Sequence, residues 1–358
     1  MIEIKNVSYS YENAVADGAL KDVSLCIPQG QTALLCGESG SGKTTFGRLV
    51  NGLIPCYYEG KLTGSVMVNG NDTTQLHELA GTVGSVFQNP KSQFYTLLTD
   101  TEIVFACENI GMEKREILRR FTETVQDFRL EKLLGKNVSQ LSGGEKQKIA
   151  CASVSMLRPP ILVLDEPTSN LDISAIRELR EIVAQWKTSG KTVLIAEHRL
   201  WWLRGLADRV VVFQEGSIVE DVPADEFWRR TPDELHAEGL RGSCRFAPQV
   251  KEHCADAQYI ISPFRSSDGE FSLNIPELKI PKGAVVASSA TAAQEKALSQ
   301  GACADLSASV RYRSSTVKTL CRAKTEQSCL HGISGRQPPA FLRERAGGCD
   351  AGAAPIRG

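Results

Sequence analysis

Gly37-Glu38-Ser39-Gly40-Ser41-Gly42-Lys43-Thr44 is the stretch that decides the fold, because it matches the pattern G-x-x-x-x-G-K-[ST]. It lies between a short, uncharged apolar run at residues 32–36 and a helix-compatible stretch at residues 43–50. Glycines in such a loop let backbone N–H groups converge on an anion, the lysine reaches the β- and γ-phosphates of a nucleotide, and the threonine hydroxyl can ligate Mg²⁺. A Gly/Ser turn that only leads into a helix is the alternative, and the flanking strand and helix argue against it. The residues predicted to bind nucleotide are Gly37, Glu38, Ser39, Gly40, Ser41, Gly42, Lys43, Thr44 and Thr45.

Further short apolar runs alternate with helical patterns along the chain. They lie at residues 2–10, 83–87, 161–164, 193–196 and 210–213. Strands that alternate with helices predict an α/β sheet whose ligands bind at the carboxyl ends of the strands. The pattern becomes charged and irregular around residues 223–242, where we place the end of the first domain.

Two carboxylates directly follow the apolar run at residues 161–164. Asp165 and Glu166 stand at the end of this predicted strand and precede Pro167. An Asp-Glu pair in that place is ordinarily a solvated loop or a helix cap. Here the phosphate loop supplies a ligand for them, so Asp165 is predicted to hold Mg²⁺ and Glu166 to polarise an attacking water.

A second glycine-containing helix start precedes this pair. Residues 141–147 read Leu-Ser-Gly-Gly-Glu-Lys-Gln, and Glu145 lies 20 residues before Asp165 (165 minus 145). A serine and two glycines at a helix N-terminus can bind an anion. Alone, the segment is more typical of a helix cap, but its place upstream of the carboxylate pair makes the combination specific.

Residues 37–44, 141–147 and 161–167 resemble, in this order, the Walker A, signature and Walker B motifs of ABC transporter ATP-binding subunits. The resemblance covers about residues 1–235. It implies an α/β P-loop NTPase fold of the ABC ATPase type, in which a mixed sheet core carries a helical subdomain, and an ATPase that forms ADP and phosphate.

The resemblance also implies roles for single residues. Tyr11 is similar to the aromatic residue that stacks on adenine, with Tyr9 as a competitor. Gln88 resembles the Q-loop glutamine that touches Mg²⁺ and water, residues 169–172 resemble the D-loop, and His198 resembles the switch histidine that contacts the γ-phosphate. The implied catalytic residues are Glu166, His198 and Gln88, and the implied Mg²⁺ ligands are Thr44, Gln88 and Asp165.

Two protein partners follow from the same resemblance. A second cassette faces the first head to tail, so that each ATP lies between one phosphate loop and the partner's signature, here Ser142, Gly143, Gly144 and Glu145. A transmembrane subunit docks a short helix beside the Q-loop, near residues 88–102. Residues 57–64, 88–94 and 197–199 are further similar to energy-coupling factor (ECF) ATPases, which drive vitamin or metal uptake and include forms with two cassettes in one chain.

A second, degenerate copy of this fold is predicted after the first domain. Residues 278–283 repeat the L-x-I-P-x-G pattern of residues 25–30. In that register residues 290–297 replace the phosphate loop, and only Lys296 is kept, so no anion-binding loop is expected there. The predicted domains are an ABC nucleotide-binding domain (1–235), a linker (236–256), the degenerate start of a second ABC domain (257–312) and an irregular tail (313–358). A disordered tail and a disrupted reading frame both stay open for the last segment.

The composition limits the location and the partners. The formal net charge is −1, which argues against a nucleic-acid partner held by bulk charge. The sequence has no apolar run long enough for a spanning helix and no signal pattern at its start, so we expect a peripheral protein on the cytoplasmic face of the membrane.

Two other readings stay open. The chain could be a soluble ABC ATPase that is not coupled to a membrane, or a non-functional remnant of a two-cassette protein. The DNA-repair type of soluble ABC ATPase is disfavoured, because 53 residues between Gln88 and Leu141 (141 minus 88) leave no room for a long coiled coil. No signal in the sequence specifies the transported substrate, or whether the partner cassette is a second copy or a different chain.

Overall fold

The computed structural model describes residues 1–12, 18–240, 257–261, 264–268, 271–275, 278–281 and 310–312. Contacts divide the chain into two units, Met1–Gln249 and Val250–Gly358.

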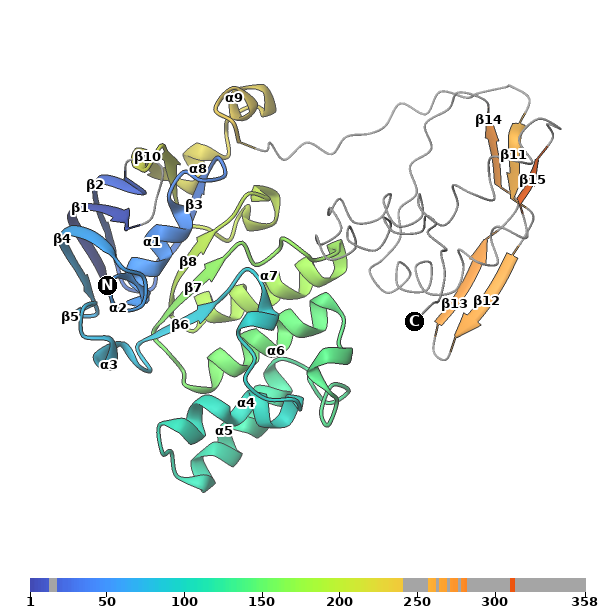
Figure 1. The fold of residues 1–358 in the computed structure, drawn as a ribbon, viewed down its shortest axis with the longest axis horizontal. Helices are drawn as coiled ribbons and strands as arrows, with labels where there is room; N and C mark the ends of the chain where they lie inside the picture. Colours follow the sequence, from blue (N-terminus) through green and yellow to red (C-terminus); the bar gives the residue numbers. More distant parts are fainter. Residues whose placement is uncertain are drawn as a thin grey trace, which may run out of the picture. The chain divides into compact units, whose positions relative to one another are not determined.

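A six-stranded sheet forms the centre of the first unit, in the order β10-β9-β3-β8-β7-β6 (Figure 1). Neighbouring strands run parallel except β10, which is antiparallel to β9. β3, β7 and β8 are almost wholly buried, as their uninterrupted apolar sequences predict. The strands are β3 (Thr32–Gly37), β6 (Val83–Val86), β7 (Ile161–Asp165), β8 (Thr192–Ala196), β9 (Arg209–Gln214) and β10 (Ser217–Pro223).

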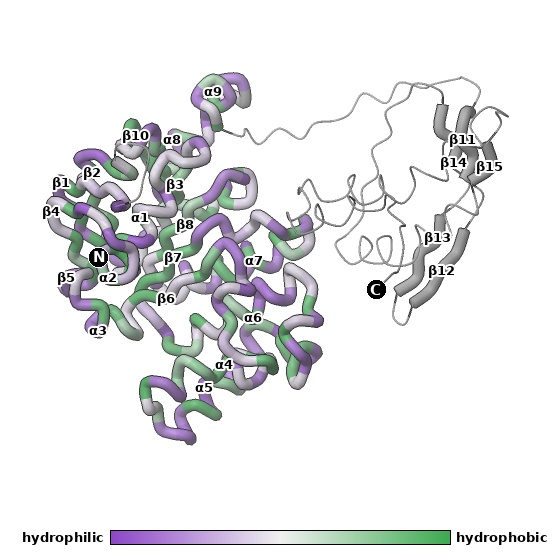
Figure 2. The backbone as a smooth tube through the Cα atoms, viewed as in Figure 1, coloured by the Kyte–Doolittle hydropathy of each residue, from purple (hydrophilic) through white to green (hydrophobic). Residues whose placement is uncertain are grey.

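A smaller antiparallel sheet has the order β2-β1-β4-β5. Its inner side chains share one apolar core with α1 (Lys43–Val50) and with one face of the large sheet. This core includes Phe46 of α1 and Val163 and Phe213 of the large sheet. Figure 2 shows hydrophobic colour concentrated along the strands of the large sheet. This core fixes the position of the helix that follows the phosphate loop. The strands are β1 (Ile2–Tyr11), β2 (Leu20–Ile27), β4 (Gly60–Val68) and β5 (Asn71–Asp72).

Helices pack on the other face of the large sheet and form a second core. Three of them lie between β6 and β7 in the chain and form a helical subdomain: α4 (Thr99–Asn109), α5 (Lys114–Asp127) and α6 (Gly143–Met156). The fold class predicted from the sequence, a mixed sheet with a helical subdomain, is therefore confirmed. The other helices are α2 (Leu53–Cys56), α3 (Leu76–Leu79), α7 (Ile173–Thr188), α8 (Ala224–Phe227) and α9 (Pro232–Ala237), with 3₁₀ turns η1 (Pro90–Ser92), η2 (Val138–Gln140) and η3 (Leu200–Leu203).

The first unit continues past residue 235. Leu235 on α9 and Leu240 beyond it are both buried in the helix-side core. The linker that the sequence predicts from residue 236 therefore begins with residues that pack on this unit. Within the described ranges, no helix has the length and apolar content needed to cross a membrane.

The second unit contains short strands only, in its described residues. β14 (Leu278–Pro281) and β15 (Val310–Tyr312) pair antiparallel with β11 (Ala257–Ile261), and β12 (Phe264–Asp268) pairs with β13 (Phe271–Ile275). The order β14-β11-β15 repeats the order β2-β1-β4 of the first unit. The degenerate second domain and its boundaries stay predictions, because residues 290–297 and 313–358 lie outside the described residues.

Candidate active site

The phosphate loop begins where β3 ends, at a glycine that no other residue can replace without strain. Gly37 has φ 141°, and a Cβ atom there would lie 2.2 Å from the carbonyl oxygen of Phe213. Gly42, just before α1, has φ 107°. Both values belong to a region of backbone conformation that favours glycine. The predicted loop between a buried strand and a helix is thus present.

Lys43 is buried at the start of α1 and points back into the loop. Its Nζ atom donates hydrogen bonds to the carbonyl oxygens of Gly37 (3.0 Å) and Glu38 (2.7 Å) and to the Ser41 hydroxyl (3.2 Å). Burial lowers the pKa of Lys43, and the negative charge of Glu166 opposes that shift. The loop therefore holds a buried cation at its centre.

Thr44 and Asp165 form an oxygen-donor pair at the ends of α1 and β7. The Thr44 hydroxyl donates to Oδ1 of Asp165 at 2.9 Å. Burial raises the pKa of Asp165, while this hydrogen bond acts in the opposite direction. In the part of the chain that the structure describes, no group of three or more His, Cys, Asp or Glu side chains could hold a metal. One hydroxyl and one carboxylate fit Mg²⁺, which takes few protein ligands and completes its shell with phosphate oxygens and water.

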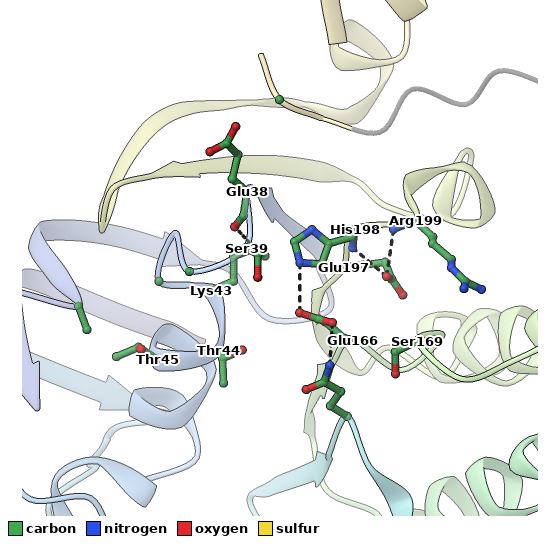
Figure 3. Close-up of a pocket in the computed structure, with 15 residues that line it drawn as sticks. Glu38, Ser39, Lys43, Thr44, Thr45, Glu166, Ser169, Glu197, His198 and Arg199 are labelled. Carbon is green, nitrogen blue, oxygen red and sulfur yellow. Dashed lines mark hydrogen bonds and ion pairs between the residues drawn. The ribbon is translucent and has the colours of Figure 1, made fainter. Parts of the chain in front are cut away.

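The Glu166 carboxylate faces the side chain of His198, as Figure 3 shows. Its Oε2 atom accepts a hydrogen bond from Nε2 of Gln88 at 2.9 Å, and its Oε1 atom lies 3.1 Å from Nε2 of His198. Glu166 also has φ 41°, an uncommon value for a residue with a side chain. The structure thus brings together all three residues predicted to be catalytic.

Glu197 is a site residue that the sequence analysis missed. It is only 2% exposed, and it accepts hydrogen bonds from the backbone amides of His198 (2.8 Å) and Arg199 (3.0 Å) and from the Thr168 hydroxyl (2.6 Å). A carboxylate at the end of the apolar run 193–196 was the available signal, because an ionised side chain beside a buried strand requires partners.

The two candidate adenine-stacking tyrosines have different environments. Tyr9 is 1% exposed and its hydroxyl donates to the carbonyl oxygens of Tyr58 and Glu59, so it belongs to the core. The Tyr11 hydroxyl lies 3.1 Å from the hydroxyl of Thr45, next to the phosphate loop. Of the pair, Tyr11 is the one beside the candidate nucleotide site.

The signature segment forms the N-terminus of α6. The Ser142 hydroxyl accepts from the Glu145 amide (3.3 Å), and the Ser142 amide donates to Oε2 of Glu145 (2.7 Å), a reciprocal capping box. A Cβ atom on Gly144 would lie 2.7 Å from Cβ of Ala175 on α7, so this glycine also allows close helix packing. The structure does not bring these residues to the phosphate loop of their own chain.

The phosphate loop, Glu166 and His198 surround one cavity of about 650 Å³. It includes neither Tyr11 nor the signature residues. Five of its lining residues are not among the predicted site residues: Ala19, Ser169, Glu197, Arg199 and Gly239. The full lining is Ala19, Glu38, Ser39, Gly40, Gly42, Lys43, Thr44, Thr45, Gln88, Glu166, Ser169, Glu197, His198, Arg199 and Gly239.

An exposed apolar surface follows the Q-loop. Tyr95 is 77% exposed and stacks on Phe105 with ring centroids 4.9 Å apart, and Leu97 is 74% exposed. Buried Glu102 on α4 accepts hydrogen bonds from the amides of Tyr95 (3.0 Å) and Thr96 (2.7 Å). This carboxylate fixes the backbone of the segment that carries the exposed side chains.

The chain is similar to proteins of one known family. The profile of the ABC transporter family matches residues 20–169. One putative ABC transporter ATP-binding protein of Treponema denticola is 44% identical over 253 residues, 70% of this chain and 51% of that protein. Another from the same organism is 37% identical, over 97% of this chain and 70% of that protein. The chain thus spans about half of the first relative and more than two thirds of the second.

A solved structure has the same fold. It is an ATP-binding cassette in a dimeric, post-hydrolysis state bound to ADP and Pi, with 28% identity and a TM-score of 0.53. The match covers 63% of this chain and 99% of that one. On the motifs, the fold and the 37% identity to a relative of which it covers 70%, the chain belongs to the ABC transporter ATP-binding proteins.

Proposed function

We propose that this chain binds ATP with Mg²⁺, hydrolyses it to ADP and phosphate, and so powers substrate import by an ABC transporter of the ECF type. The observation that carries the proposal is the Glu166 carboxylate, held between Gln88 and His198 on the cavity that also contains Lys43. A carboxylate in that place can orient and polarise a water for attack on a γ-phosphate.

The contacts support a role for each residue of the site. Lys43 exchanges hydrogen bonds with loop carbonyl oxygens for bonds to the β- and γ-phosphates, which are stronger because both partners are charged. Thr44, Asp165 and Gln88 would hold Mg²⁺, which supplies positive charge against the phosphate oxygens. His198 and Gln88 fix the two oxygens of Glu166 and thereby its orientation toward the water.

Hydrolysis in this proposal requires a second cassette. The signature residues lie outside the cavity of their own chain, and their capped helix N-terminus offers backbone N–H groups and a positive dipole end to an anion. We infer that Ser142, Gly143, Gly144 and Glu145 contact the ATP of a partner cassette, so that ATP binding closes the dimer and hydrolysis reopens it. The dimeric state of the similar cassette with ADP and Pi supports this arrangement.

The membrane subunit would dock beside the Q-loop. Tyr95 and Leu97 expose apolar area there, and Gln88, which precedes that segment in the chain, donates a hydrogen bond to Glu166. Aromatic side chains of this kind are typical anchors of a protein interface. The segments 57–64, 88–94 and 197–199 are the basis for choosing the ECF type, and peripheral attachment to the cytoplasmic face of the membrane follows from that choice.

The full chain tests the proposal directly. Purified protein should release phosphate from ATP only with Mg²⁺, and Glu166→Gln should form an ATP-dependent dimer in size-exclusion chromatography with light scattering. Affinity-tagged protein from its native host should carry a transmembrane subunit, identified by mass spectrometry. Hydrolysis without a membrane partner would instead indicate a soluble ABC ATPase, and folded protein without hydrolysis or ATP binding would indicate a remnant.

A further inference from the structure

A buried carboxylate outside the predicted catalytic set connects two loops of the site. Both oxygens of Glu197 are occupied: Oε1 accepts from the amides of His198 and Arg199, and Oε2 accepts from the hydroxyl of Thr168. Glu197 and Thr168 are 2% and 0% exposed. Burying an ionised carboxylate is costly unless its oxygens are hydrogen-bonded, and here three donors converge on it.

These donors come from two different loops. Thr168 belongs to the segment after β7, two residues beyond Glu166, whereas His198 and Arg199 follow β8. Two further bonds join the same segments: the Glu166 amide donates to the carbonyl of Ala196 at 2.8 Å, and Nη1 of Arg199 donates to the carbonyl of Leu171 at 3.2 Å. Among these residues, the side chain of Glu197 is hydrogen-bonded both to the segment after β7 and to the loop after β8.

Glu197 is connected through His198 to Glu166, and the proposed chemistry uses both His198 and Glu166. His198 reaches Glu166 at 3.1 Å through its side chain, while its backbone amide is bonded to Glu197. A displacement of about 1 Å at a reacting group can lower turnover by about 100-fold. A buried side chain that fixes the backbone of His198 can therefore control turnover, although its hydrogen bond is to that backbone and not to either reacting side chain.

We propose that Glu197 is a positioning residue that fixes the His198 loop to the segment 167–171, so that His198 keeps its distance from Glu166. The inference rests on the proposed roles of Glu166 and His198 in ATP hydrolysis. Loss of the Glu197 side chain should lower turnover and leave ATP affinity unchanged, because the phosphate loop has its own scaffold on β3 and α1.

The primary test compares Glu197→Ala with Glu197→Gln in the full chain. The alanine variant should lower kcat by about 10- to 100-fold with ATP affinity within about 2-fold of wild type. The glutamine variant should stay within about 3-fold of wild type, because its amide oxygen still accepts from the two backbone amides and its NH₂ group can donate to Thr168. A kcat for Glu197→Ala equal to that of wild type would overturn the inference.

Asp208→Ala is a matched control for lost stability. Asp208 accepts a hydrogen bond from the amide of Thr32 at 2.8 Å, at the opposite end of the same sheet. This variant should lower the thermal midpoint without a change in kcat. If Glu197→Ala does not fold, Thr168→Val tests the proposal instead. This variant removes the hydroxyl that donates to Glu197 and keeps the shape of the Thr168 side chain. Folded Thr168→Val with unchanged kcat would then reject the proposal.

A double-mutant cycle separates positioning from a general structural effect. In a His198→Ala background, Glu197→Ala should cause no further loss of kcat, because the side chain that it positions is gone. An equal additional loss would show that Glu197 acts otherwise than through His198. Glu166→Gln keeps the two hypotheses apart: if it retains full hydrolysis, the proposed function fails first, whereas if it stops hydrolysis and Glu197→Ala does not slow it, only this inference fails.

Discussion

Nε2 of His198 lies 3.1 Å from Oε1 of Glu166, although the two residues are separated by 32 positions in sequence (198 minus 166). Glu166 follows β7, His198 follows β8, and Gln88 follows β6, and these strands are neighbours in the order β8-β7-β6. Parallel strands end at the same edge of a sheet, so their following residues meet there. The topology thus brings the three side chains together.

Glu166→Gln should still bind ATP while its turnover falls by about 100-fold or more, because the amide keeps the shape and loses the charge that polarises water. Phosphate release under single-turnover conditions and titration with a fluorescent ATP analogue measure the two properties separately. Near-normal hydrolysis would reject the role assigned to Glu166.

Lys43→Ala should weaken ATP binding by about 10-fold or more, since a charge-assisted bond to phosphate contributes roughly 1.5–3 kcal/mol. The buried side chain also bonds to Gly37, Glu38 and Ser41, so the loop itself loses support in this variant. The measurement is calorimetric titration with ATP and Mg²⁺, alongside thermal unfolding. A folded variant with unchanged affinity would count against the phosphate-loop assignment.

Much of the site could be predicted because its residues follow apolar strands with recognisable motifs. The carboxylates after β7 and the glycine loop after β3 are of this kind. Glu197 was missed because its role depends on a hydrogen bond from Thr168, and no sequence pattern links these two residues. The environments of Tyr9 and Tyr11 also required the structure, since residues two apart lie on the same face of a strand and only packing shows which of the two is buried.

Tyr95→Ala combined with Leu97→Ala should leave ATP hydrolysis by the isolated chain unchanged and should abolish recovery of the membrane subunit. Both side chains are exposed on a segment whose backbone Glu102 holds, so the substitution removes apolar contact area without unfolding the segment. Leu118→Ala on α5, which is 56% exposed, is the matched control and should keep the partner. Equal recovery from both variants would place the docking surface elsewhere.

Cys36 and Cys151 should resist alkylation in the native protein at pH 8. Burial raises the pKa of each thiol to about 12, so both stay protonated and unreactive between pH 7 and about 9. Cys26 is exposed and serves as an internal control that iodoacetamide should modify. Peptide mapping by mass spectrometry reads out each site, and the two buried thiols should react only after unfolding in guanidinium. Rapid native modification of Cys151 would contradict the described packing.

A chain that lacks the second unit and ends at Arg241 should bind ATP as tightly as the full chain. Every residue assigned to the nucleotide lies between Tyr11 and His198, and the strands that carry them belong to the first unit. The shortened chain must retain Leu235 and Leu240, because both are buried in the core of the first unit.

A shorter chain that ends at Arg230 is the control, because it removes α9 and both of these leucines. It should lose thermal stability, since each buried leucine contributes roughly 1.5–3 kcal/mol. ATP affinity by titration and thermal unfolding are measured on all three chains. If the chain ending at Arg241 is folded but binds ATP much more weakly than the full chain, the second unit contributes to the site. The interpretation of that unit as degenerate would then be wrong.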